Sequence, residues 1–173
     1  MAQSADANAA ATVLVYSDDR NTREQVRLAL GRRAWPGGPE LRWIECATAA
    51  AVVRAMDLHA SGKVPVRLAI LDGEAVPEGG MGLCRRLKDE IYGCPPVLVL
   101  IGRPQDSWLA GWSRADAAVP APVDPAVLAE TAAALLRGPG ASGAADSGRE
   151  GSGGADSGGA GGSGPDVRDV LAS

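Results

Sequence analysis

The chain has 173 residues and a formal net charge of −4 at pH 7, which leaves room for one domain of ordinary size. Its two lysines, Lys63 and Lys88, form no basic run, which disfavours a nucleic-acid partner, since phosphates are neutralised by clustered Lys and Arg. No apolar run approaches the roughly 20 residues of a membrane helix, and residues 1–11 do not resemble a signal peptide, so we expect a cytoplasmic protein without direct membrane insertion.

Short β-type runs alternate with helical patterns along the chain, which predicts βα units around a parallel sheet. In chain order, the expected elements are a strand 12–16, a helix bearing Val26, Leu28 and Leu30, a strand 41–46, a helix capped by Thr48, a strand 66–71, a helix 82–91, a strand 97–101, a short helix after 104–106, a strand 117–119 and a helix 125–137 capped by Asp124. The pattern predicts a doubly wound α/β fold, a flavodoxin-like (βα)5 sandwich with parallel strand order 2-1-3-4-5.

The composition changes abruptly at residue 138. Residues 138–164 hold 12 of the 23 glycines and cannot bury enough apolar surface to offset their ordering entropy. We therefore predict a disordered N-terminus over 1–11, one folded domain over 12–137 and a disordered Gly/Ala/Ser-rich tail over 138–173. Near the end of that tail, Val167, Val170 and Leu171 would form one apolar stripe on a helix, which indicates either a docking segment on a tether or a frayed end.

Cysteine and histidine are too few for most metal sites and nucleophilic triads. Cys46, Cys84 and Cys94 form no CxxC pair, and such an odd count is typical of a reduced cytosolic protein. His59 is the single histidine, and we interpret it as a surface residue near the end of a helix. We therefore expect that the protein is not an enzyme.

Acidic residues follow two strands that the predicted order makes neighbours. Asp18 and Asp19 come directly after the first strand, and Asp72 ends the third. Functional residues of a doubly wound sheet gather at the carboxyl ends of its strands, so these carboxylates are expected to converge. Acids that close repel one another unless a cation lies among them, and Mg²⁺ suits such an oxygen site. The sequence therefore predicts Mg²⁺ held by Asp18, Asp19 and Asp72, with Asp72 able to attack phosphorus.

The chain resembles the receiver domains of two-component response regulators over about residues 12–137. The resemblance is carried by Val13-Leu14-Val15-Tyr16-Ser17-Asp18-Asp19, Leu68-Ala69-Ile70-Leu71-Asp72, Pro96-Val97-Leu98-Val99-Leu100, and Ala115-Asp116 with Pro122. It implies that Asp72 accepts a phosphoryl group from a histidine kinase in a phosphorelay and that Asp18 is the second member of the metal-binding acid pair. The tail is too short for a DNA-binding output domain, so output is expected to pass through a protein partner.

The sequence also departs from the receiver pattern. Ser17 stands in place of the first acid of the metal-binding pair, and Ile101 stands in place of the hydroxyl residue that meets the phosphoryl group. Near the fifth strand, Ala121 replaces the lysine before the proline, and Ala118 replaces the aromatic residue that reports switching. The loop after Asp72 is long, and Glu74 adds a carboxylate to it. We expect a weak or absent conformational readout. Arg103 is either a replacement cation or a solvated loop residue.

Several interpretations stay open at this stage. The first is a phosphorylated receiver, and its alternative is a pseudo-receiver that binds a protein constitutively or is an accessory subunit of a larger complex. Asp72 is either the phospho-acceptor or a strand-end acid that fixes the next loop. Trp108 and Trp112, one helical turn apart, form an interaction face or pack on the sheet. A phosphatase of the haloacid-dehalogenase type is disfavoured because it needs aspartate where this chain has Glu74.

Overall fold

The computed structural model describes residues 10–138. The predictions made for residues 1–9 and 139–173, including the docking segment near Leu171, lie outside the described residues. Within the described part, no helix is long and apolar enough to cross a lipid bilayer.

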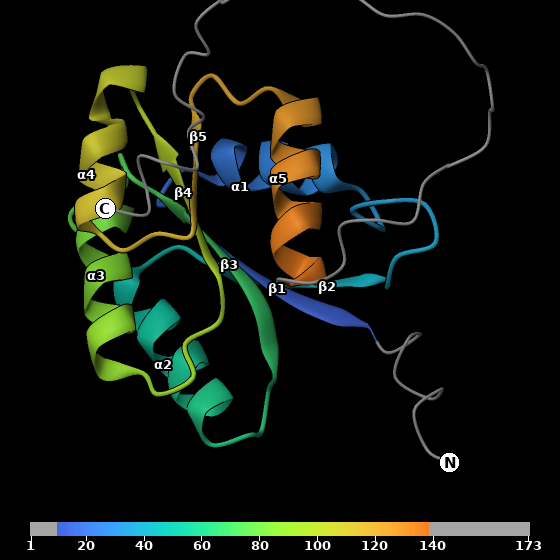
Figure 1. Cartoon of the computed structure of the whole chain (residues 1–173). Coiled ribbons are helices and arrows are strands. Elements are labelled where there is room, and N and C mark those ends of the chain that lie inside the picture. The colour runs from blue at the N-terminus through green and yellow to red at the C-terminus, as the bar shows by residue number, and fades with distance from the viewer. Residues whose placement is uncertain (1–9, 139–173) are drawn as a thin grey trace, which may run out of the picture.

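Five parallel strands form one sheet in the order β2-β1-β3-β4-β5, which confirms the predicted fold (Figure 1). The strands are β1 (Ala11–Tyr16), β2 (Leu41–Cys46), β3 (Val66–Asp72), β4 (Val97–Ile101) and β5 (Ala117–Pro120). In the sheet register Tyr16 is paired with Leu71, and Asp72 with Leu100. The carboxyl ends of β1, β3 and β4 therefore meet at one edge of the sheet.

Helices cover both faces of the sheet. They are α1 (Arg20–Leu30), α2 (Ala49–Ala60), α3 (Gly80–Glu90), α4 (Ser107–Trp112), which follows a 3₁₀ turn at Pro104–Asp106, and α5 (Pro125–Arg137). The expected caps are confirmed: the Thr48 side chain accepts a hydrogen bond from the backbone of Ala51, and the Asp124 carboxylate accepts from Ala126 and Val127.

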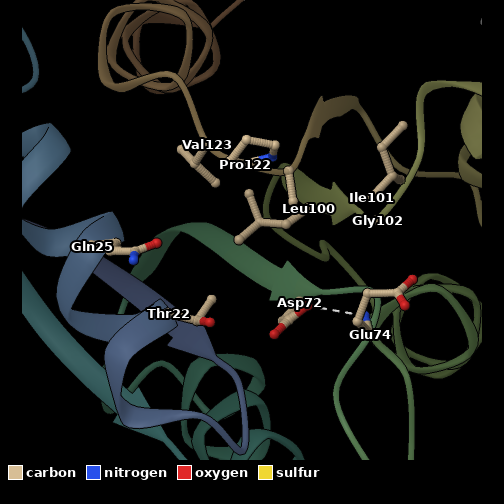
Figure 2. A pocket seen from close by; sticks show the side chains of 10 residues that line it. Thr22, Gln25, Asp72, Glu74, Leu100, Ile101, Gly102, Pro122 and Val123 are labelled. Carbon is tan, nitrogen blue, oxygen red and sulfur yellow. Dashed lines mark hydrogen bonds between the residues drawn. The ribbon is translucent and has the colours of Figure 1, made fainter.

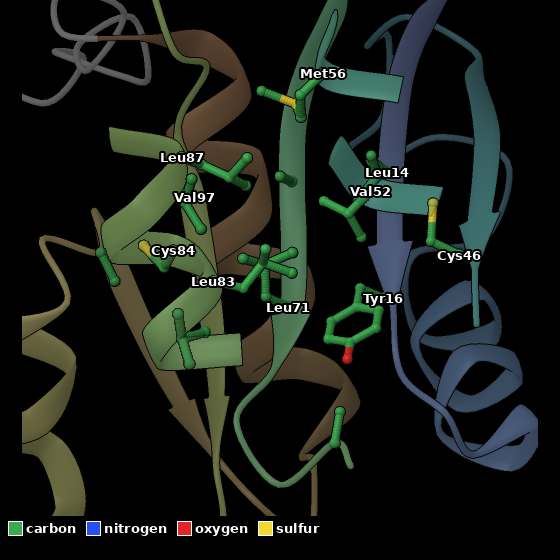
Figure 3. Close-up of a cluster of buried hydrophobic side chains, with 14 of the residues drawn as sticks. Leu14, Tyr16, Cys46, Val52, Met56, Leu71, Leu83, Cys84, Leu87 and Val97 are labelled. Atoms are coloured by element: carbon green, nitrogen blue, oxygen red, sulfur yellow. The ribbon is translucent and has the colours of Figure 1, made fainter. Parts of the chain in front are cut away.

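The core consists of two layers, one on each face of the sheet. One layer packs α2, α3 and α4 against the sheet and includes Tyr16, Met56, Leu71 and Leu83 (Figure 3). The other packs α1 and α5 against the opposite face, with Val26 and Leu128 among its buried residues. Because side chains alternate along a strand, successive residues of β4 belong to different layers.

Helix α3 begins at Gly80, two residues before the predicted start. A Cβ at Gly80 would lie 2.6 Å from the carbonyl oxygen of Asp72, and a Cβ at Gly79 would lie 2.7 Å from that of Gly73. The two glycines therefore let the chain fold back onto the end of β3 at a distance that no larger residue permits. This close packing, rather than helical propensity, sets where α3 starts.

Candidate functional site

Asp72, the last residue of β3, lies beside an open pocket at the carboxyl edge of the sheet. Its side chain borders a hollow of about 170 Å³ (Figure 2). The residues that line this hollow are Thr22, Gln25, Asp72, Glu74, Leu100, Ile101, Gly102, Ala121, Pro122 and Val123. Most of the wall is apolar, and Asp72 and Glu74 are the acidic residues that line it.

Both oxygens of the Asp72 carboxylate accept a hydrogen bond. Oδ1 accepts from the backbone N–H of Glu74 at 2.9 Å, and Oδ2 accepts from the hydroxyl of Ser17 at 2.7 Å. Asp72 is 9% exposed and Ser17 is fully buried. The Ser17 hydroxyl also accepts from the backbone N–H of Asp19 at 3.0 Å, so its single proton is directed to Asp72. Asp72 thus fixes the start of the following loop, which is the role expected of a strand-end acid. Hydrogen bonds to both of its oxygens hold the carboxylate in place.

The three expected metal-binding acids do not gather around one point. The Asp19 carboxylate caps α1, where it accepts from the backbone N–H of Asn21 at 2.8 Å. Asp18 Oδ1 accepts from the backbone N–H of Val76 at 3.1 Å. Among the described residues no group of three His, Cys, Asp or Glu side chains could hold a metal ion. The expected three-acid group is therefore not found, and Asp19 caps α1 instead. Binding of Mg²⁺ by Asp18 and Asp72 stays a prediction.

Tyr16 brings a phenol to this edge that the sequence analysis treated only as part of a strand. Its hydroxyl donates a 2.6 Å hydrogen bond to the backbone oxygen of Glu78 in the loop after β3. Burial raises the pKa of Tyr16 above its usual value, and the charges of Glu78, Asp18 and Asp72 raise it further. The position of Tyr16 shortly before Asp18 and Asp19 is the feature of the sequence that could have indicated its place at this edge. The phenol ties the acidic edge to the loop that covers it.

Comparison with known proteins identifies the family. No family model matches the chain. Uncharacterized response regulatory proteins from two Mycobacterium tuberculosis strains, CDC 1551 and H37Rv, are each 55% identical to it over 134 residues, which cover 78% of this chain and 97% of the relative. The chain belongs to the response-regulator receiver family.

Solved receiver domains share the fold at low sequence identity. The beryllofluoride-activated DrrB receiver matches with a TM-score of 0.55 at 19% identity, over 73% of this chain and 97% of that one. A chemotaxis response regulator of Vibrio cholerae matches with a TM-score of 0.56 at 19% identity, over 73% and 99%. A putative response regulator from Chloroflexus aurantiacus matches with a TM-score of 0.59 at 21% identity, over 73% and 98%. These likenesses show the receiver fold and carry no further argument.

Among the described residues that line the pocket of this receiver, none is a lysine or an arginine. Ala121 stands where the family has lysine, and the exposed Arg103 does not line the hollow. Lys88 instead lies on α3 with its Nζ 2.6 Å from Asp116 Oδ2. The nearest cation to the Ser17 backbone is Arg23, whose Nη1 donates to the Ser17 carbonyl at 2.6 Å. Arg23 was missed because nothing in its local sequence predicts that contact.

The wall at the end of β4 is built from Ile101 and Gly102. Ile101 is 3% exposed and belongs to the core layer under α2, α3 and α4. A Cβ at Gly102 would come within 2.6 Å of the Glu74 side chain, so Gly102 makes room for this side chain against the end of β4. The family's hydroxyl position therefore contributes packing, and Glu74 occupies the adjacent space.

The two tryptophans of α4 are both exposed. Trp108 is 66% and Trp112 55% exposed, whereas Ala110 between them is fully buried. The interpretation that they pack on the sheet is wrong for both, because α4 turns its small residue inward. Whether they form an interaction face stays a prediction.

Proposed function

We propose that this receiver accepts a phosphoryl group on Asp72 and signals through contacts with a protein partner. The observation that carries the proposal is the position of Asp72, whose carboxylate ends β3 and borders an open pocket. A histidine kinase is the proposed donor, a downstream protein the proposed target, and the cytoplasm the proposed location. Nothing in this role requires turnover of a substrate, so we propose no enzymatic activity.

The transfer step makes one bond and breaks one. A carboxylate oxygen of Asp72 attacks phosphorus and forms an O–P bond, while the N–P bond of the donor phosphohistidine breaks. The leaving imidazole keeps the electron pair of that bond and takes up a proton from solvent. Ser17 and the Glu74 backbone N–H orient the carboxylate through hydrogen bonds of 2.7 and 2.9 Å, which limits its rotation before attack.

Mg²⁺ fits the donor chemistry of this edge in part. The ion is commonly held by one or two carboxylates together with water, and Asp18 and Asp72 offer these carboxylates. Asp18 accepts from the backbone of Val76 and Asp72 from that of Glu74, so both carboxylates contact the loop after β3. When bound, the ion would offset the negative charge of the phosphoryl oxygens. Asp18 would have to exchange its hydrogen bond from Val76 for the ion.

A second candidate function is a pseudo-receiver that binds its protein partner without phosphorylation, alone or as an accessory subunit. It is favoured by the hydrogen bond from Ser17, which already occupies one Asp72 oxygen, and by the absence of Lys or Arg from the residues that line the pocket. The burial of Ile101 supports the same candidate, because the residue that usually meets the phosphoryl group is here fixed in the core.

Phosphoramidate treatment in the presence of Mg²⁺ tests the first proposal. We expect the intact mass of the protein to rise by one phosphoryl group, and the Asp72→Asn variant to show no such rise. Asp57→Asn removes an exposed carboxylate from α2 and should be modified like the wild type. A folded wild-type protein that gains no mass would refute phosphorylation and leave the pseudo-receiver.

Beryllofluoride, a mimic of the aspartyl phosphate, tests the readout separately. Binding that leaves tryptophan fluorescence unchanged would support an acceptor whose conformational response is weak, as the burial of Ile101 and the loss of the lysine predict. A saturable change in fluorescence that is lost in Asp72→Asn would instead show a working switch.

A further inference from the structure

The side of the molecule formed by α3 and α4 presents an exposed apolar and basic surface. We define this α3–α4 face by Arg85, Trp108, Trp112 and Arg114; the two helices lie next to each other in Figure 1. Trp108 and Trp112 are separated by four residues and so share one side of α4, each with more than half of its surface exposed. Exposed aromatic side chains of this size are typical of binding hot spots.

The charges around the two indoles leave this face positive. Asp89 pairs with both Arg85, at 3.1 Å, and Arg114, at 2.6 Å, so two guanidinium groups share one carboxylate. The Arg85 guanidinium also lies 5.6 Å from the centre of the Trp112 ring and donates to the Trp112 carbonyl at 3.0 Å. One net positive charge therefore lies next to an exposed apolar surface.

The backbone at the end of α4 is held in an uncommon conformation. Arg114 has φ of 62°, and it is the one residue other than glycine with positive φ among the described residues. Left-handed backbone is unfavourable for a residue with a Cβ. Arg114 in turn contacts Asp89, the carboxylate that Arg85 also contacts. The backbone N–H of Arg114 donates to the Gly111 carbonyl at 3.0 Å, so this conformation ends α4.

We propose that the C-terminal segment of this same chain, residues 165–171, docks on the α3–α4 face. Val167, Val170 and Leu171 would form one apolar stripe if the segment became helical, and such a stripe matches the two exposed indoles. The side chains of Asp166, Arg168 and Asp169 give the segment one net negative charge, which complements the positive charge of the α3–α4 face. Neither feature depends on phosphorylation of Asp72, so this inference stands apart from the proposed function.

The connecting chain is long enough to allow this contact. Residues 139–164 provide 26 residues of chain, and Gly-rich linkers of that length span roughly 25–30 Å on average. A domain of this size has a radius of gyration of roughly 14 Å. A fully extended chain of 26 residues spans roughly 85–95 Å, so the segment can reach either side of the domain. At an effective concentration of about 1 mM, even a segment with Kd of about 0.1 mM would be docked roughly 90% of the time. Docking would cover Trp108 and Trp112 and compete with any protein partner for the same face.

The test uses the full chain and the indole N–H signals of its tryptophans in ¹H–¹⁵N spectra. Trp108→Phe and Trp112→Phe assign the two signals of α4, while Trp35 and Trp43, half-buried against the α1 and α5 layer, are internal references. We expect V170D/L171D to shift the signals of Trp108 and Trp112 and to increase their quenching by acrylamide. The double substitution A155D/A160D adds the same charge to the spacer and should leave both signals in place.

Two further measurements identify the occupant. A synthetic peptide of residues 165–173 added to V170D/L171D should return the Trp108 and Trp112 signals towards their wild-type positions, whereas a peptide with Asp at 170 and 171 should not. Identical spectra for the wild type and V170D/L171D would overturn the proposal. Protection of the indoles that disappears on dilution of the wild type would also overturn it, since a second copy would then supply the contact.

Discussion

The hydrogen bond from Ser17 to Asp72 should contribute measurably to folding stability, and the Ser17→Ala substitution tests it. The bond is 2.7 Å long and joins the hydroxyl of Ser17 to a carboxylate. Because Ser17 is fully buried, its hydroxyl is not exposed to water that could replace this bond. Hydrogen bonds to charged groups contribute about 1.5–3 kcal/mol, and loss of the hydroxyl also leaves the Asp19 backbone N–H without its acceptor. We expect Ser17→Ala to lower the free energy of unfolding by about 2–3 kcal/mol.

A double-mutant cycle assigns that loss to the pair. Urea unfolding is measured for the wild type, Ser17→Ala, Asp72→Ala and the double variant. If the bond carries the effect, the cost of Ser17→Ala should fall below about 1 kcal/mol once Asp72 is absent. With a denaturant slope of about 2 kcal/mol/M, the single substitution should shift the midpoint by roughly 1 M.

Ser113 provides a matched control for this cycle. It is another fully buried serine, and its hydroxyl donates to the Ala110 carbonyl at 2.6 Å rather than to Asp72. Ser113→Ala should cost the same with and without Asp72. A cost of Ser17→Ala that is equally independent of Asp72, within about 0.5 kcal/mol, would refute the reasoning and attribute the loss to packing.

Three other predictions follow from contacts described above. Gly80→Ala should lower the free energy of unfolding by about 1–3 kcal/mol in urea unfolding, because its Cβ would meet backbone at 2.6 Å, whereas Gly82→Ala, with open space around its Cβ, should raise it by about 0.5–1 kcal/mol; equal effects would contradict the close-packing account. Burial raises the pKa of Cys46 and Cys84 from 9.0 to about 11, so the unfolded chain loses these protons first and stability should fall as pH rises from 9 to 11; a double Cys→Ala variant should show a smaller fall, and an unchanged fall would exclude the thiols as its cause. Tyr16→Phe removes the hydroxyl that donates to the loop after β3 and should cost about 1 kcal/mol and increase amide hydrogen exchange in that loop; unchanged exchange would show that the phenol does not hold it.

The fold was predictable because its signals are local. The strand β4 (VLVLI) is a continuous apolar run that fits a strand covered on both faces, and all five of its residues are buried. Thr48 and Asp124 are residue types that accept from free helix N–H groups, and each caps the helix that follows it. The strand order 2-1-3-4-5 is a common order of such doubly wound sheets, so it was expected once the alternation of strands and helices was recognised.

The candidate site was only partly predictable because its contacts join distant segments. Asp72 was expected at the carboxyl edge and lies there, yet its partner Ser17 is 55 residues away in sequence. Asp19 is chemically suited to a metal and equally suited to a helix cap, and only the backbone geometry after β1 decides between these roles. His59 lies partly exposed near the end of α2, as expected, and it also accepts from the backbone N–H of Val66 at 3.1 Å, which links α2 to β3. No local pattern carries that information.

The burial of Ile101 has a consequence for conformational exchange in this receiver. The Ile101 side chain is 3% exposed, so it holds the start of the segment between β4 and α4 in the core. Exposing such a side chain to water costs about 1.5–3 kcal/mol. An arrangement of that segment with Ile101 exposed is therefore an excited state with a population of roughly 7% or less. A modification at Asp72 could make this state dominant only by favouring it by more than that cost. Relaxation-dispersion measurements on the amides of residues 101–106 would therefore detect a sparsely populated state in wild type and a larger population in Ile101→Thr.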